Sequence, residues 1–221
     1  MKIIAALCML IDHIGFVFFP MKMGLRMIGR LAMPIFAYCL GRGLVYTRSK
    51  KRYMMRLGLF AILSQLPFYL LQQAAGYGRD LDLNIGFTFL LAACTVWCLE
   101  LSFEAERKLV KAIYLLAGII GILLSEVIPM DYGSYGALIV ISSYLVIKGN
   151  KPFMLLPMLY TMITVMCYGS DSGMLYLQEI GVLGYGICYL LSSVSERRWG
   201  KFFYIFYPLH MMLLWGVKCL L

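Results

Sequence analysis

Charged residues are scarce in this chain of 221 residues: Asp, Glu, Lys and Arg make up 14% of it, whereas hydrophobic residues make up 62%. A soluble globular domain has about 25% charged and about 45–50% apolar residues. So little polar surface cannot cover a water-soluble particle of this size. The composition therefore excludes soluble nucleotide-fold enzymes, secreted disulfide scaffolds and DNA-binding modules, and it indicates a polytopic membrane protein.

Patterns of metal ligands are also missing. The chain has two histidines and seven cysteines, and no group of them has the spacing of a zinc site. Cys94 and Cys98 would share one face of a helix, but two thiols alone make a poor metal site. We expect no metal site, and we interpret the cysteines as small buried hydrophobic residues.

Apolar stretches of nearly membrane-spanning length recur along the chain, with Pro and Gly between them. Neither a repeat nor a long polar linker is visible, so we expect one integral-membrane domain over residues 1–221. The predicted fold is an all-α transmembrane helix bundle with about nine spans, in a range of about eight to ten. The predicted helices cover residues 3–20, 24–46, 57–75, 84–103, 109–128, 134–148, 153–169, 178–195 and 202–221.

The cations are distributed unevenly along this predicted topology. Fourteen of the 20 Lys and Arg residues fall on one side of the bundle and four on the other. Because cations near helix ends are retained in the cytoplasm, we expect a cytoplasmic N-terminus and a multi-pass protein of the plasma or inner membrane. The positive charge is thereby explained by topology, and we expect the lipid bilayer rather than a nucleic acid as partner.

The first apolar run is similar to a signal peptide, because it follows Met1 and Lys2 directly. However, this run contains Asp12 and His13, and it shows no cleavage site with small residues. We therefore expect it to be a retained first helix.

A few ionisable residues interrupt the predicted spans. A charge near the bilayer centre costs at least about 2.5–3.5 kcal/mol on insertion scales, so each one needs a partner or a function. Those near predicted helix ends can extend to the headgroups. The ionisable residues are Asp12, His13, Arg30, Arg42, Glu100, Glu126 and His210.

The two histidines are predicted to lie at comparable depth. At about 1.5 Å per residue, His13 lies about 16 Å along its helix from Lys2, and His210 lies roughly 12 Å along its helix from Phe202. A neutral imidazole can be buried and exchanges a proton near pH 7, as a general base must. A packing or hydrogen-bonding role is the alternative.

Asp12 precedes His13 directly, and successive helix positions are rotated by about 100°, so the two side chains cannot form a simple dyad. Asp12 either pairs with Arg26 or Arg30 or helps to hold an acceptor. Pro34 is expected to kink the helix that carries Arg30. A broken cationic helix beside His13 would suit an anionic or carbonyl ligand.

Uncharged polar side chains fall within or beside other predicted spans. Gln65 precedes Leu66 and Pro67, and Asn84 and Thr88 lie at the start of a predicted helix. These groups either contact a substrate or hold the helices together by hydrogen bonds.

At these residues the sequence resembles the TraX family, which is named for the acetylase of the conjugative F pilin. The resemblance covers nearly the whole chain in a series of ordered blocks. The blocks are Lys2–Ala5, Met9–Gly15, Gly29–Ala37, Arg48–Arg56, Ser64–Phe68, Leu83–Asn84, Phe87–Thr88 and Tyr207–His210.

A more distant similarity is to the transmembrane acyltransferases of the acyltransferase-3 type. Their first helix carries a basic residue, ten intervening positions and a histidine, which Lys2 and His13 reproduce with Lys in place of the usual Arg. The tetrapeptide Tyr207–His210 is similar to one in their last helix.

These resemblances imply a membrane acetyltransferase that moves an acetyl group from cytoplasmic acetyl-CoA to an amine or hydroxyl of an exported pilin-like peptide, a glycan or a lipid. The implied catalytic residues are His13 as general base, with Asp12, His210 and Arg30, which would stabilise the acyl oxygen. The implied coenzyme ligands are Lys2, Arg48 and Arg52. The implied acceptor-binding residues are Arg26, Gln65, Asn84 and Thr88.

Two other functions suit parts of the same pattern. A small proton-coupled transporter would also contain an Asp beside a His in mid-membrane. A non-catalytic membrane scaffold would use the polar residues only for helix packing.

Overall fold

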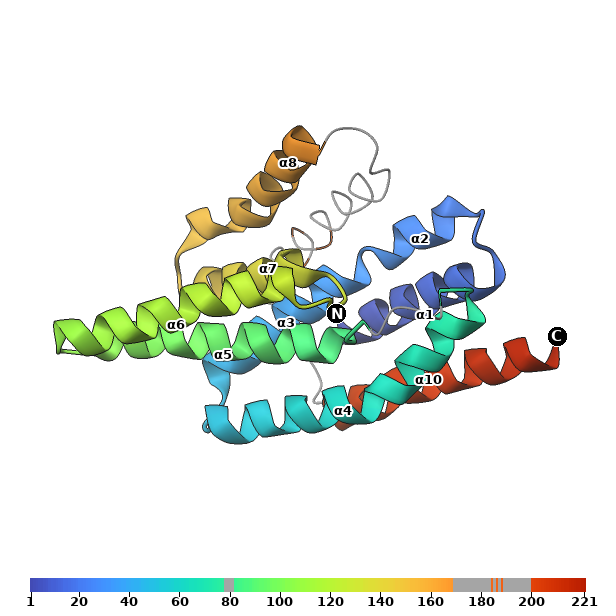
Figure 1. The fold of residues 1–221 in the computed structure, drawn as a ribbon, viewed down its shortest axis with the longest axis horizontal. Coiled ribbons are helices and arrows are strands. Elements are labelled where there is room, and N and C mark those ends of the chain that lie inside the picture. Colours follow the sequence, from blue (N-terminus) through green and yellow to red (C-terminus); the bar gives the residue numbers. More distant parts are fainter. Residues whose placement is uncertain (78–81, 169–183, 185, 187, 189–199) are drawn as a thin grey trace. The chain divides into compact units, whose positions relative to one another are not determined.

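The computed structural model describes residues 1–221 except for residues 78–81, 169–183, 185, 187 and 189–199. Within this described part, all the named secondary-structure elements are helices (Figure 1), which confirms the predicted all-α class. The α-helices are α1 (Lys2–Phe18), α2 (Met23–Gly29), α3 (Ala32–Tyr46), α4 (Lys50–Ala74), α5 (Ile85–Glu104), α6 (Lys108–Val127), α7 (Gly133–Ile147), α8 (Leu156–Tyr168) and α10 (Gly200–Leu220). A short 3₁₀ helix, η1, covers Lys151–Leu155.

The chain forms two compact units. The first consists of Met1–Cys39, Leu63–Leu81 and Met158–Leu221, and the second of Leu40–Ile62 and Asp82–Pro157. Helices α3, α4 and α8 therefore contribute residues to both units. The helix predicted over residues 178–195 lies almost entirely outside the described residues.

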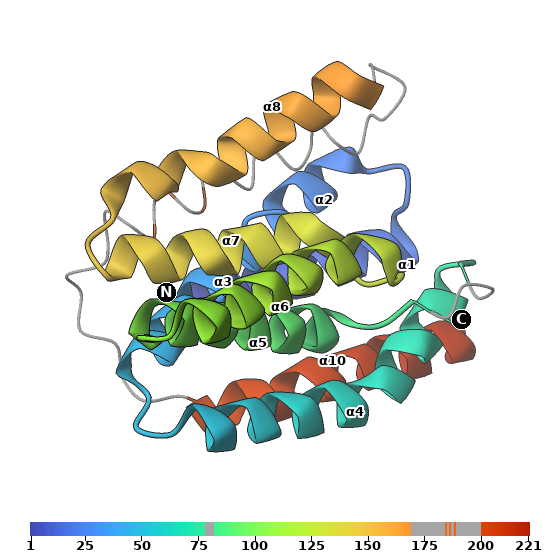
Figure 2. The ribbon, with the colours of Figure 1, turned by 60° about the vertical axis from the view of Figure 1, so that its left-hand side comes forward.

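In the first unit, α1 packs against α2 and α10 (Figures 1 and 2). Two glycines allow α1 and α2 to come close together. A Cβ atom on Gly15 would lie 2.7 Å from the Cβ of Leu25, and a Cβ on Gly29 would overlap the side chain of Asp12. Small residues at such crossings bring helix backbones together within a membrane.

The helix predicted over residues 24–46 is interrupted, as Pro34 led us to expect. The structure shows a turn at Arg30 and Leu31, between α2 and α3. Pro34 has no N–H to donate to the carbonyl of Arg30, and its ring clashes with that carbonyl in a continuous helix. The new helix begins at Ala32, so Pro34 lies in its first turn, where no intrahelical donor is needed.

The basic segment after α3 was expected to be a loop up to residue 56, and this expectation is wrong. Only residues 47–49 connect the helices, and α4 already begins at Lys50. The hydroxyl of Ser49 accepts a hydrogen bond from the backbone N–H of Arg52, with 3.4 Å between the two atoms. A serine that caps a helix in this way stabilises its first turn, and the basic residues from Lys50 onwards therefore lie on a helix.

In the second unit, α5 packs against α6 and α7. Helix α7 is buried along most of its length, whereas α6 buries only Gly118, Gly121 and Ser125. These three residues share one face of α6. The remaining surface of α6 carries large exposed apolar residues such as Ile113, Ile120 and Leu123, as expected for a surface that faces lipid.

Five helical segments in the described part are long and apolar enough to cross a membrane. They are Met23–Tyr46, Lys50–Ala74, Ile85–Glu104, Lys108–Val127 and Phe202–Leu220, the first of which combines α2 and α3. The apolar helix α7 is shorter. The protein is therefore a membrane protein with several apolar helices, while the number of nine spans and the cytoplasmic N-terminus stay predictions.

Replacing Asn84 with alanine is expected to destabilise the second unit by about 2–4 kcal/mol. The fully buried Asn84 caps α5 by accepting from the backbone N–H of Gly86 at 2.8 Å, and its amide donates to the carbonyl of Ala61 at 2.8 Å. Thermal unfolding of the detergent-solubilised protein measures the loss. Serine keeps an oxygen for the cap, so Asn84→Ser should lose about half as much. An unchanged unfolding temperature in the alanine variant would contradict this assignment.

Candidate functional site

The two histidines of the chain meet inside the first unit. His13 on α1 and His210 on α10 come within 2.7 Å of each other, measured from Nδ1 of His13 to Nε2 of His210. The ring planes differ by only 4° and the ring centroids are 5.0 Å apart. Since the centroid distance exceeds the N···N distance by about two ring radii, the rings lie edge to edge in a common plane, as an N–H···N hydrogen bond requires.

His210 is the less exposed member of this pair, with 4% of its surface exposed. Its Nδ1 lies 2.8 Å from the carbonyl oxygen of Phe206, one turn earlier in α10. Helical side chains lean toward the N-terminus of their helix, which brings the ring back over that carbonyl. The Phe206 ring is nearly parallel to the imidazole, with centroids 4.9 Å apart. Two contacts from Phe206 thus fix the orientation of His210.

His13 is the accessible member of the pair. Its side chain is partly exposed, in contrast to that of His210. Its Nδ1 is used by the contact with His210, whereas its Nε2 makes no hydrogen bond with any residue in the described part of the chain. Of the two rings, His13 is therefore the more exposed and the one with a ring nitrogen not engaged by a described residue.

Asp12 lies next to His13 in the sequence but contacts a different helix. Its Oδ2 accepts a hydrogen bond of 2.7 Å from Nη1 of Arg26 on α2, which also forms an ion pair. The Arg26 guanidinium lies 4.9 Å from the centroid of the Phe16 ring, and Phe16 in turn lies against Tyr77. Asp12 thus contacts α2 while His13 contacts α10, as the rotation between successive helix positions predicts.

Of the other predicted site residues of the first unit, Arg30 lies near enough to Asp12 for their charges to interact. Arg30 lies in the turn between α2 and α3 and is partly exposed. Lys2 begins α1, the helix that carries His13. Gln65 lies in α4 and is half-buried. The structure brings Asp12 and Arg26 into contact, and likewise His13 and His210.

Four predicted site residues lie in the second unit. Asn84 and Thr88 are fully buried, and both make hydrogen bonds within this unit. Asn84 caps α5 and bonds to Ala61, and the hydroxyl of Thr88 donates to the carbonyl of Asp131 at 2.6 Å. These bonds favour the interpretation that both residues hold the helices together. Arg48 is exposed in the connection between α3 and α4, and Arg52 is exposed in the first turn of α4.

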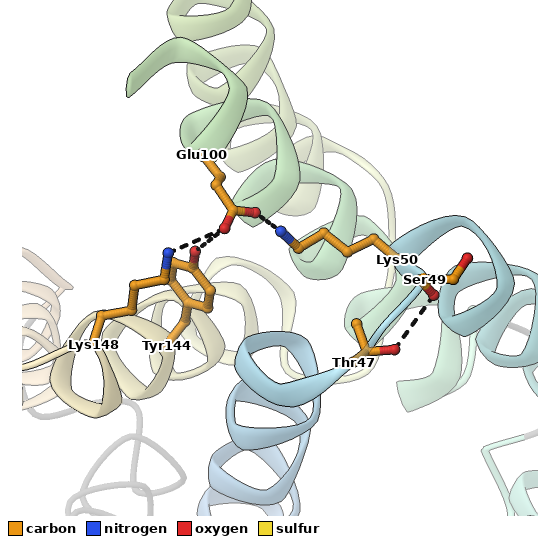
Figure 3. A network of polar contacts seen from close by, with 6 residues as sticks. All are labelled: Thr47, Ser49, Lys50, Glu100, Tyr144 and Lys148. Atoms are coloured by element: carbon orange, nitrogen blue, oxygen red, sulfur yellow. Dashed lines mark hydrogen bonds and ion pairs between the residues drawn. The ribbon is translucent and has the colours of Figure 1, made fainter. Parts of the chain in front are cut away.

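A polar cluster that we call the Glu100 cluster lies in the second unit and was not expected from the sequence. It consists of Glu100 on α5, Lys50 on α4, and Tyr144 and Lys148 at the end of α7 (Figure 3). Glu100 accepts from the Tyr144 hydroxyl at 2.9 Å and from Lys148 at 3.1 Å, and it pairs with Lys50. Its side chain is only 12% exposed, because these partners surround it.

This cluster could have been predicted from the topology. Lys50 and Lys148 both belong to segments that the charge distribution places on one side of the membrane, and Glu100 precedes the end of a helix on that same side. An acid within reach of two cations is expected to pair with them. No group of three or more His, Cys, Asp or Glu side chains is arranged to hold a metal ion in the described part of the chain.

Comparison with known proteins gives one family match and two informative relatives. The TraX protein family matches residues 1–218. A probable fimbrial assembly protein FimC, serogroup H1, from Dichelobacter nodosus is 26% identical, over 100% of this chain and 95% of that protein. Protein TraX from Escherichia coli is 27% identical, over 99% of this chain and 86% of that protein.

No solved structure matches the chain. The family match, in contrast, covers residues 1–218, from before the start of α1 into the last turn of α10, and it includes both histidines of the pair. The chain therefore belongs to the TraX family.

Proposed function

We propose that this protein is an acetyltransferase of the plasma or inner membrane, which moves an acetyl group from cytoplasmic acetyl-CoA to the amine or hydroxyl of an exported peptide, a glycan or a lipid. The observation that carries this proposal is the hydrogen-bonded pair of His13 and His210, with one ring nitrogen of His13 left without a hydrogen bond among the described residues. An imidazole in this situation is suited to remove a proton from an acceptor.

In the proposed reaction, His13 acts as the general base. It takes the proton from the acceptor as the acceptor nitrogen or oxygen attacks the acetyl carbonyl of the thioester. The C–N or C–O bond forms, the C–S bond breaks, and the coenzyme leaves as a thiolate that is then protonated. Arg30, in the turn between α2 and α3, is proposed to stabilise the negative charge on the acetyl oxygen during the attack.

The basic residues are proposed to bind the coenzyme. Lys2 lies at the start of the helix that carries His13, about 16 Å from it along the axis at the rise of an α-helix. The phosphates of acetyl-CoA are separated from its thioester by the long pantetheine arm, so phosphates at Lys2 are compatible with a thioester near His13. Arg48 and Arg52 are exposed cations that would also attract these phosphates.

The names of the relatives support a peptide as acceptor. One relative is named for fimbrial assembly, and the other is Protein TraX. An exported pilin-like peptide is therefore the acceptor class that we favour, with a glycan or a lipid as the alternative. The residue proposed to hold the acceptor beside His13 is Gln65, together with the ion pair of Asp12 and Arg26.

The proposal is tested by comparing cells with and without the gene. Mass spectrometry of surface peptides, glycans and lipids should reveal one class that loses an acetyl increment of about 42 daltons when the gene is absent. Purified protein should retain radiolabelled acetyl-CoA, and the variant Lys2→Ala should retain less. Proton flux into proteoliposomes without acetyl-CoA, together with unchanged acetylation in cells, would instead favour a proton-coupled transporter.

A further inference from the structure

We infer that His13 and His210 form a two-histidine proton relay, in which Nε2 of His13 takes up the proton and His210 carries the resulting charge. For its catalytic meaning this inference rests on the acetyl transfer proposed above. The hydrogen-bonding geometry on which it is built is independent of the reaction.

A backbone carbonyl fixes the tautomer of His210. Its Nδ1 lies 2.8 Å from the carbonyl oxygen of Phe206. A carbonyl oxygen can only accept a hydrogen bond, so Nδ1 must carry a proton. In the neutral ring, Nε2 of His210 therefore has a lone pair and acts as an acceptor.

The tautomer of His210 in turn fixes the tautomer of His13. Nε2 of His210 lies 2.7 Å from Nδ1 of His13, in the plane of both rings. Because Nε2 of His210 accepts, Nδ1 of His13 must donate. The lone pair of the neutral pair is thereby left on Nε2 of His13, so a single backbone carbonyl fixes the tautomers of both rings.

The two rings differ in how exposed they are and in whether a ring nitrogen is left to accept a proton. His210 is 4% exposed, and both of its ring nitrogens are occupied by hydrogen bonds. His13 is partly exposed, and its Nε2 makes no hydrogen bond within the described residues. A proton from the attacking amine or hydroxyl therefore enters the pair at His13. His210, however, is the ring whose charged form can donate two hydrogen bonds, one to the Phe206 carbonyl and one to Nδ1 of His13.

The relay consists of two coupled proton transfers. The acceptor loses its proton to Nε2 of His13, and the proton on Nδ1 of His13 moves to Nε2 of His210. His13 is then neutral with its proton on Nε2, and His210 is an imidazolium that donates to Phe206 and to His13. After the C–S bond breaks, both transfers reverse and deliver the proton to the thiolate, which leaves as the free thiol of coenzyme A.

A spectroscopic experiment tests the tautomers without measuring activity. The chain contains only two histidines, so ¹⁵N-histidine labelling gives a spectrum of two rings. In protein reconstituted in lipid bilayers at alkaline pH, both rings should be protonated on Nδ1, and a coupling should connect Nδ1 of one ring to Nε2 of the other. The variant His210→Gln assigns the signals. A ring protonated on Nε2, or the absence of the coupling, would overturn the inference.

Activity distinguishes a relay from a purely structural role. Glutamine at position 210 offers a carbonyl that can accept from Nδ1 of His13, but it cannot take up the proton. We expect His210→Gln to lower kcat about tenfold and His210→Ala, which also loses the acceptor, about 100-fold. Equal rates in the wild type and the Gln variant would contradict the relay. If no acetyl transfer occurs in the wild type while the tautomers are as stated, the proposed function fails and the hydrogen-bonding arrangement stands.

Discussion

Replacing His13 with glutamine is expected to lower the rate of acetyl transfer by about 10²–10⁴-fold, the range typical for loss of a general base. Glutamine can occupy a similar volume and still form a hydrogen bond with His210. However, its amide nitrogen has no lone pair available to take up the proton of the attacking amine or hydroxyl. The rate is measured as release of the coenzyme thiol from acetyl-CoA by purified protein in bilayers that contain a membrane extract as source of acceptor.

The matched control for this variant is Tyr69→Phe. Tyr69 lies in the part of α4 that belongs to the same unit, and its hydroxyl accepts a hydrogen bond from the exposed amide of Gln73, with 2.7 Å between the atoms. This control should keep the wild-type rate. Both variants must show the elution volume and unfolding temperature of the wild type in detergent. A His13→Gln protein that is folded and retains acetyl transfer within about threefold would exclude His13 as the base.

Replacing Arg26 with methionine is expected to destabilise the first unit by about 3–5 kcal/mol. The side chains of Arg26 and Asp12 are only 18% and 13% exposed, and they lie 2.7 Å apart. Without Arg26, the Asp12 carboxylate remains buried without its ion-pair partner on α2, and a charge in this situation is more costly than the intact pair. Chemical denaturation of the detergent-solubilised protein, followed by circular dichroism, measures the loss of stability.

The double variant Asp12→Asn with Arg26→Met separates the effect of charge from that of packing. It removes both charges and keeps similar side-chain volumes, so we expect most of the lost stability to return. If the double variant is as unstable as Arg26→Met alone, the arginine stabilises the unit through its contact with the Phe16 ring instead. A single Arg26→Met variant with wild-type stability would contradict both explanations.

Much of the fold could be predicted because membrane helices depend on strong and local signals. Long apolar runs gave the bounds of α5, α6 and α7 within one residue. Pro34 predicted the interruption of its helix because a missing N–H acts on the backbone of its own segment. The prediction was wrong between residues 50 and 56, where a run of cations was interpreted as a loop although Ser49 caps a helix there.

The candidate site could be predicted only in part. Equal depth predicted that His13 and His210 could meet, because the position of a residue along a helix determines its depth in the membrane. Depth alone does not determine which ring donates to the other. That choice depends on the Phe206 carbonyl, a group that every residue possesses and that therefore gives no signal in a sequence. Likewise, the capping role of Asn84 depends on where α5 begins.

The ion pair between α1 and α2 also has a consequence for how the protein is made. Asp12 and Arg26 are separated by 14 positions along the chain, and their charges neutralise each other across the close contact at Gly29. The first helix on its own would bring an unpaired carboxylate into the hydrocarbon, which is unfavourable. We therefore expect α1 to insert stably only when the segment of α2 and α3 is present to supply Arg26.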